Sequence, residues 1–231
     1  MKTLKESLLD NEDEVVDNVS LKPLIEKWLR DNKVHLYKIN KDNTIDLKQG
    51  IIIREDLPSY IQFNKVDGTY KITGNVTTLR GCPREVIEDF WMRDCPKLKN
   101  IDYFPEKIND CLIIEKCDEL INLKGVENTH VDGGVNLSNL YILTLRYFPK
   151  CDSDCIISIE ELNVIDSLIG IPNEIGKLGL YYCKKLNNIN DIHQVKYRLS
   201  IYGCPKISIN DVKKKMKDVK GQVILDSIEL K

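Results

Sequence analysis

The chain has 231 residues, of which 42% are hydrophobic and 30% are charged, as is usual for a globular protein. Its formal net charge of −2 excludes a strong overall attraction to nucleic acid or to anionic membranes. No apolar run approaches the roughly 20 residues that span a bilayer. The N-terminus has neither the apolar core nor the small-residue cleavage site of a signal peptide. These features predict a cytoplasmic protein that does not act at a membrane.

The first 69 residues are predicted to form an N-terminal cap and an irregular beginning of the fold. Residues 1–33 contain an acidic arm followed by a capping helix over 21–31, with Ser20 as its N-cap. Apolar residues at helical spacing give this helix one buried stripe. This stripe of the helix consists of Leu21, Leu24, Ile25, Trp28 and Leu29. Residues 34–69 are predicted to form a degenerate first coil.

Residues 70–208 contain a repeated pattern of apolar residues. The pattern L-x-L-x-x-C-x-x-L-x-x-I begins at Leu178 and recurs 21 residues later at Leu199. Repeats of this length are typical of solenoids. Alternating apolar residues at positions one and three predict a short strand with one buried face, and the later apolar positions bend the chain around the core. About seven copies of 20–23 residues begin at Tyr70, Phe90, Leu112, Val135, Ile157, Leu178 and Leu199.

The C-terminal residues 209–231 are predicted to close the last coil. Asn210 is the expected N-cap of a helix over 211–219, with Gly221 just beyond its end and a final strand over 222–228. Lysines crowd the polar side of this helix, and a solvated surface is favoured over a nucleic-acid site because the chain is not basic overall. These lysines are Lys213, Lys214, Lys215, Lys217 and Lys220.

The eight cysteines are predicted to be reduced thiols. Four of them occupy the sixth repeat position, where other copies carry Leu140 and Leu162, so this position is an apolar slot. A four-thiolate metal site is the less favoured alternative, because its cysteines lack the tight paired spacing of structural zinc sites. That alternative would use Cys111, Cys117, Cys151 and Cys155, and the favoured prediction has no metal and no cofactor.

The repeat resembles the leucine-rich repeat, L-x-x-L-x-L-x-x-[N/C]-x-L, with cysteines at its Asn/Cys position. The segments CPKLKNI (95–101) and CKKLNNI (183–189) are similar to bacterial surface-type repeats. MKTLKESLL, IEKWLRDN, YKINKDNTIDL and TTLRGCP are similar to uncharacterised repeat proteins of tailed phages and gut bacteria. The resemblance implies a solenoid used for binding and no enzymatic activity. The predicted fold is thus an α/β-type, leucine-rich-repeat-like solenoid of mostly short parallel strands with loops, with helical caps at both ends.

No catalytic constellation is found in the sequence. The P-loop, nucleophile-elbow and zinc-protease motifs do not occur, which predicts a protein that is not an enzyme. The three histidines show no paired spacing, and Asp152 and Asp154 are interpreted as loop residues. Gly133 and Gly134 are expected in a tight turn between copies.

The candidate binding site lies on the strand face that points away from the core. Positions two and four of each copy should project from this face, and aromatic and arginine side chains there are the types enriched at binding hot spots. Aromatic residues also suit strand surfaces intrinsically, so an ordinary surface remains the alternative. The leading hypothesis is a protein–protein interaction module with no small-molecule substrate; the alternative is a self-assembling, virion-associated component. The candidate residues are Trp91, Arg93, Tyr181, Tyr182 and Tyr202.

Overall fold

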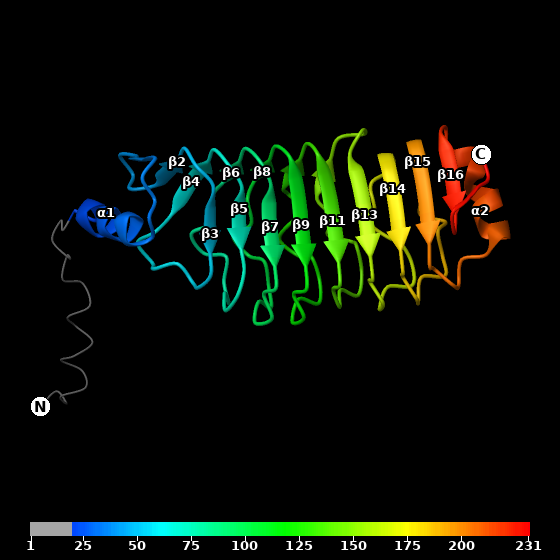
Figure 1. Cartoon of the computed structure of the whole chain (residues 1–231), viewed down its shortest axis with the longest axis horizontal. Coiled ribbons are helices and arrows are strands. Elements are labelled where there is room, and N and C mark those ends of the chain that lie inside the picture. Colours follow the sequence, from blue (N-terminus) through cyan, green and yellow to red (C-terminus); the bar gives the residue numbers. More distant parts are fainter. Residues whose placement is uncertain (1–19) are drawn as a thin grey trace, which may run out of the picture.

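A computed structural model describes residues 20–231 and shows an elongated solenoid of stacked parallel strands (Figure 1). One sheet has ten strands, in the order β17-β16-β15-β14-β13-β11-β9-β7-β5-β3. All neighbours in it are parallel except β16 and β17, which leaves nine parallel rungs. The predicted solenoid is therefore confirmed. The predicted acidic arm over residues 1–19 lies outside the described residues.

The ten-stranded sheet contains the strand predicted at the start of every copy. The first apolar residue of each of the seven copies is buried in this sheet. Consecutive copies pair in register, for example Leu178 with Leu199 and Val135 with Ile157. Its strands are β3 (Ile51–Ile53), β5 (Tyr70–Ile72), β7 (Phe90–Arg93), β9 (Cys111–Glu115), β11 (Gly134–Ser138), β13 (Ile156–Glu160), β14 (Glu174–Tyr181), β15 (Gln194–Tyr202), β16 (Gln222–Leu225) and β17 (Ile228–Glu229).

A second, seven-stranded sheet forms the opposite wall, and the repeat pattern did not predict it. Strands β2 and β4 each bury two apolar residues, whereas β6, β8 and β10 each bury one, namely Val86, Ile108 and Val131. In the two coils that contain β14 and β15, the two strand segments of the coil are continuous and form one long strand. The pairing of β14 with β15 has a register shift between Ile175 and Lys177. The shorter strands are β1 (Tyr37–Ile39), β2 (Ile45–Leu47), β4 (Phe63–Val66), β6 (Glu85–Val86), β8 (Lys107–Ile108), β10 (His130–Val131) and β12 (Lys150–Cys151).

One continuous hydrophobic core runs between the two sheets along the length of the solenoid. Aliphatic side chains stack at equivalent positions, and each fully buried one contributes about 1.5–3 kcal/mol. At the N-terminal end the core is aromatic instead. Trp28, Phe63, Tyr70, Phe90 and Phe104 form a chain of ring contacts with centroids 4.7–6.1 Å apart.

A short helix lies at each end of the solenoid (Figure 1). Helix α1 (Lys22–Asp31) buries Ile25 and Leu29 of its predicted apolar stripe, whereas Leu21 and Leu24 of that stripe are exposed. The predicted N-cap was wrong: Leu21 occupies the N-cap position and makes no side-chain cap. These are the only α-helices in residues 20–231, so the α/β-type assignment is not confirmed.

The C-terminal helix begins and ends earlier than predicted. Helix α2 (Ile209–Lys215) starts after Ser208, whose hydroxyl accepts from the backbone N–H of Asp211, while the Asp211 carboxylate accepts from that of Ser208. This reciprocal cap explains why Ser208, and not Asn210, begins the helix. A 3₁₀ turn over Met216–Asp218 follows, and strands β16 and β17 close the sheet.

Seven coils turn within two residues of the end of their strand through a residue with left-handed backbone geometry. Six of these residues donate their backbone N–H to a carbonyl of the next rung at 2.8–3.2 Å, and Gly203 donates to the Asp226 side chain. The left-handed region costs an ordinary residue about 1 kcal/mol, so inter-rung hydrogen bonds maintain this turn. The residues are Gly74, Asp94, Lys116, Asn139, Glu161, Tyr182 and Gly203, with φ between +51° and +84°.

Replacing Lys116 by glycine is expected to raise the free energy of unfolding by about 0.5–1 kcal/mol, because glycine has no Cβ to oppose the left-handed geometry. Lys97→Gly is the matched control, since Lys97 is exposed and lies outside the positive-φ positions. The control should lower the free energy of unfolding by about 0.5–1 kcal/mol. Urea denaturation of both variants measures the difference. Equal destabilisation by both substitutions would contradict the strain argument.

Candidate binding face

The outer face of the ten-stranded sheet presents side chains in straight rows, because its strands pair in register. In the row at the second repeat position, large side chains occupy the first four rungs and the last one, and small residues occupy the four rungs between them. In strand order from β3 to β16 this row is Ile52, Lys71, Trp91, Ile113, Asn136, Ser158, Gly179, Ser200 and Ile224. The predicted outward positions thus lie on one face, although Ser138 and Gly179 are buried there by their neighbours.

Trp91 and Arg93 form a compact cluster on β7. The guanidinium carbon of Arg93 lies 5.3 Å from the centroid of the indole ring, and Lys71 Nζ lies 5.2 Å from it. The indole N–H donates to Asp89 at 3.0 Å, and Arg93 Nε lies 2.6 Å from a carboxylate oxygen of Glu115. Both predicted residues are therefore partly exposed and held in place by intramolecular partners.

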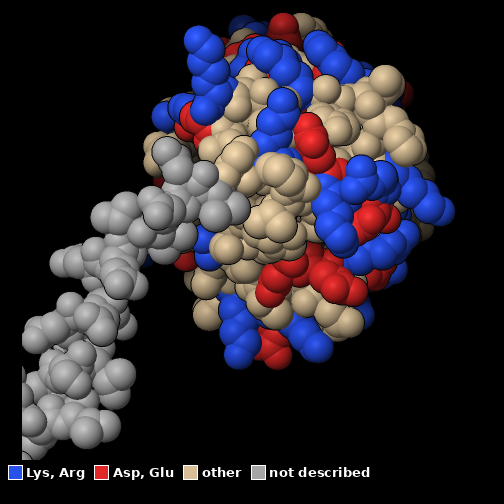
Figure 2. All heavy atoms as spheres, turned by 90° about the vertical axis from the view of Figure 1, so that its left-hand side faces the viewer, with Lys and Arg blue, Asp and Glu red and all other residues tan. Residues whose placement is uncertain are grey.

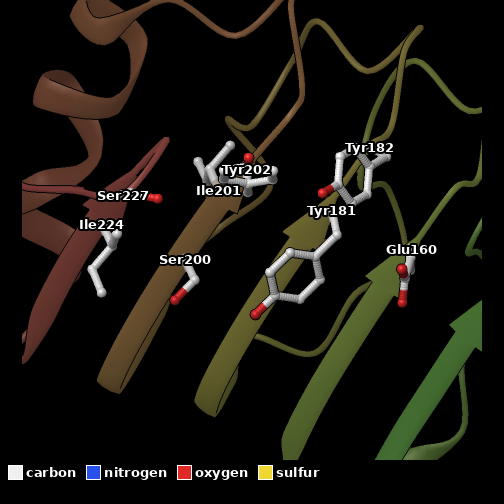
Figure 3. A pocket seen from close by; sticks show the side chains of 8 residues that line it. All are labelled: Glu160, Tyr181, Tyr182, Ser200, Ile201, Tyr202, Ile224 and Ser227. Atoms are coloured by element: carbon white, nitrogen blue, oxygen red, sulfur yellow. The ribbon is translucent and has the colours of Figure 1, made fainter.

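Tyr181, Tyr182 and Tyr202 meet around a hollow of about 480 Å³ near the C-terminal end of the face. Figure 3 shows their rings with Ser200, Glu160 and Ile224 on neighbouring strands. Tyr182 and Tyr202 pack edge to face with centroids 5.3 Å apart, yet both are more than 40% exposed. Partial desolvation, followed by the charge and hydrogen bond of the neighbouring Tyr202 hydroxyl, raises the pKa of Tyr182.

The orientation of Tyr181 depends on the glycine two residues before it. The two residues project from the same face of β14, and a Cβ added to Gly179 would lie 2.4 Å from Cε2 of the Tyr181 ring. The ring therefore lies along its own strand and occupies the space that a side chain at position 179 would fill. The sequence pattern placed Gly179 and Tyr181 on the same face, but not the ring over the glycine.

The five predicted site residues thus form two clusters and not one site. Trp91 and Arg93 belong to β7, whereas Tyr181, Tyr182 and Tyr202 belong to the region of β14 and β15. Four rung spacings separate β7 from β14, a distance of about 19 Å at the usual strand spacing.

A third feature, a shallow hollow of about 340 Å³, lies between the two clusters. Gly134 pairs with both Cys111 and Ile156 and lines this hollow, and a Cβ added to it would lie 2.9 Å from the Ile156 carbonyl oxygen. The expectation that Gly134 belongs to a turn was wrong, because it is the first residue of β11. Asn136 borders the same hollow, and its Oδ1 atom is buried without a hydrogen-bond partner.

The cysteines do not assemble into the four-thiolate site that was considered. Cys117 lies in the core beside Cys95, whereas Cys111 lies on the outer face beside Asp110. Cys151 and Cys155 contact each other instead. All eight cysteines are free, and the four at the sixth repeat position are buried among apolar side chains. The apolar-slot interpretation is therefore confirmed.

No protein family, curated protein or solved structure shows a significant match to this chain. The fold is thus shown by its own geometry, and neither the leucine-rich-repeat family nor a relationship to phage proteins is confirmed. Among residues 20–231 there is no helix long and apolar enough to cross a membrane.

The Cys111 thiol is expected to resist alkylation although it is partly exposed. Burial, followed by the hydrogen bond and charge of Asp110, raises its pKa to about 12, so little thiolate exists at pH 8. Modification by iodoacetamide should be at least ~100-fold slower than for a free cysteine. Asp110→Asn should accelerate it, because removing the carboxylate lowers the pKa. Peptide mapping by mass spectrometry gives both rates.

Asp102→Asn, in an exposed turn, is the control and should leave the Cys111 rate unchanged. Rapid alkylation of Cys111 in the unmodified chain, or no acceleration in Asp110→Asn, would contradict the assignment of the raised pKa to these two causes.

Proposed function

We propose that this chain is a non-enzymatic protein-interaction module that binds its partner through the outer face of the ten-stranded sheet. The observation that carries the proposal is the exposed hollow formed by Tyr181, Tyr182 and Tyr202. Aromatic side chains that are partly exposed on a regular sheet are available to a partner without prior rearrangement.

The rigidity of this face favours binding. Its nine parallel rungs extend over about 38 Å, and each rung is fixed by main-chain hydrogen bonds to its neighbours. Association loses less conformational entropy when the contact residues are already ordered. The rings of Tyr181, Tyr182 and Tyr202 supply a large amphipathic contact area. Tyrosine is one of the residue types that contribute most of the binding energy at protein interfaces.

The Trp91–Arg93 cluster is proposed as a second contact on the same face. Arg93 is stacked on the indole and paired with Glu115, so its side chain is ordered before a partner arrives. The distance of about 19 Å between the two clusters suits one protein surface better than one small molecule.

The cytoplasm is the proposed location, because eight free cysteines suit a reducing compartment. The repeats are proposed to be leucine-rich-repeat-like, with α1 and α2 as helical caps that cover the open ends of the core. A phage-encoded protein acting on a host protein is the corresponding biological setting, and it rests on the sequence resemblance alone.

A self-assembling structural component is the alternative function. Exposed apolar side chains at both ends favour it: Leu21, Leu24 and Leu36 at the N-terminal end, and Ile209 and Ile228 at the C-terminal end. Figure 2 shows Lys and Arg interspersed with Asp and Glu around uncharged surface at the N-terminal end, so this end does not carry charge of a single sign. Such stacking joins unlike ends and gives filaments of increasing length.

The test compares affinity capture from bacterial lysate by the unmodified chain and by Tyr181→Ala/Tyr202→Ala. The partner is then purified and its affinity measured by calorimetry. We expect the double variant to bind at least ~30-fold more weakly, because hot-spot aromatics each contribute 2 kcal/mol or more. Gly179→Ala is a finer probe, since it displaces the Tyr181 ring without removing it.

Tyr103→Ala/Tyr141→Ala is the matched control, because both tyrosines are exposed and lie outside the strands of the sheet. It should bind as the unmodified chain does. Equal affinity of the Tyr181/Tyr202 variant and this control would contradict the proposal. Size-exclusion chromatography with light scattering distinguishes the self-assembly alternative, which predicts a molar mass that increases with protein concentration in the micromolar range.

A further inference from the structure

Three metal-ligating side chains converge on the surface of the seven-stranded sheet, on the opposite wall from the proposed binding face. His130 begins strand β10, Asp132 follows that strand, and Asp152 follows strand β12 on the adjacent rung. His130 Nε2 lies 3.0 Å from Asp132 Oδ1 and 3.3 Å from Asp152 Oδ1. The three ligand atoms all lie within 4.8 Å of one another.

Two of these separations match the edges of a metal coordination polyhedron, and the third, between the two carboxylate oxygens, is at most 4.8 Å. Ligands bound at about 2.0–2.1 Å from one ion lie roughly 3.0 Å apart at neighbouring octahedral positions and roughly 3.3 Å apart at tetrahedral ones. The imidazole nitrogen of His130 faces one oxygen from each carboxylate at these two distances. A single ion can therefore bind all three atoms with small adjustments of side chains.

The backbone and a neighbouring lysine hold the ligands in position. The backbone N–H of His130 donates to the backbone carbonyl of Glu106 at 2.9 Å. The backbone N–H of Asp132 donates to the backbone carbonyl of Ile108 at 3.0 Å, and both carbonyls belong to the preceding rung. Lys107 Nζ lies 3.3 Å from Asp132 Oδ2, the oxygen that does not face the imidazole. This contact orients the carboxylate and leaves Oδ1 for a metal, as outer-shell partners of metal ligands do.

We propose that His130, Asp132 and Asp152 form a binding site for one divalent first-row transition ion, with water at the remaining coordination positions. One imidazole nitrogen and two carboxylate oxygens suit Mn²⁺, Co²⁺, Ni²⁺ or Zn²⁺, whereas Mg²⁺ and Ca²⁺ prefer oxygen ligands alone. The ion would link two adjacent rungs through side chains 20 and 22 residues apart in the sequence. This site is independent of the proposed protein-binding face.

The test titrates the metal-free full-length chain with Co²⁺ under reducing conditions and measures stoichiometry by calorimetry and the absorption spectrum. One ion should bind, with the weak visible bands of nitrogen and oxygen ligation. His130→Ala and Asp152→Asn should each lower the affinity at least ~100-fold, because the loss of a ligand exceeds the 10–100-fold effect of losing an outer-shell partner.

Two matched controls remove the same side-chain types elsewhere. His193→Ala removes an exposed imidazole, and Asp154→Asn removes a carboxylate two residues after Asp152 that instead contacts Lys196 at 3.1 Å. Both should retain the affinity of the unmodified chain. Three results would each overturn the proposal. The chain could fail to bind one Co²⁺, His130→Ala could bind as tightly as the unmodified chain, or the spectrum could contain an intense sulfur-to-cobalt charge-transfer band from Cys151. Circular dichroism establishes that every variant remains folded.

Discussion

The in-register stacking of parallel strands is the constraint on which the rest of this structure depends. Each coil alone exposes its apolar residues, and only a neighbour with the same spacing covers them. Stacking in register brings residues about 20–23 positions apart into direct contact, as Leu178 and Leu199 illustrate. The core, the outer face and the inter-rung hydrogen bonds all result from this one alignment, so the spacing of the copies is more important than any single side chain.

The turn after each strand shows how the stack tolerates local strain. Lys116, Glu161 and Tyr182 adopt left-handed backbone geometry that their side chains oppose. The cost is about 1 kcal/mol at each position, and hydrogen bonds to the next rung offset it. A strained residue in one coil is thus stabilised by its neighbour, which couples the rungs beyond their apolar contacts.

The same alignment creates sites whose members are distant in sequence. The tyrosine hollow joins Tyr181 and Tyr182 to Tyr202 across two rungs, and the His130 cluster joins Asp132 to Asp152. The first lies on one wall of the solenoid and the second on the other. A repeat protein can in this way carry two unrelated surface chemistries, because each of its two sheets is formed by a different set of positions in the repeat.

The sequence by itself determined the solenoid, the buried first residue of seven copies in the ten-stranded sheet and the burial of the cysteine slot, because alternating apolar residues at a fixed period specify which side chains face a shared core. The tertiary structure alone decided the second sheet, because two-residue strands such as Glu85–Val86 and Lys107–Ile108 contain a single buried apolar residue and no alternation. It also decided the left-handed turns, since Gly74, Asn139 and Glu161 share no residue type there. The ring over Gly179 and the convergence of His130 with Asp152 likewise depend on side-chain direction and loop path, which spacing along the chain does not encode.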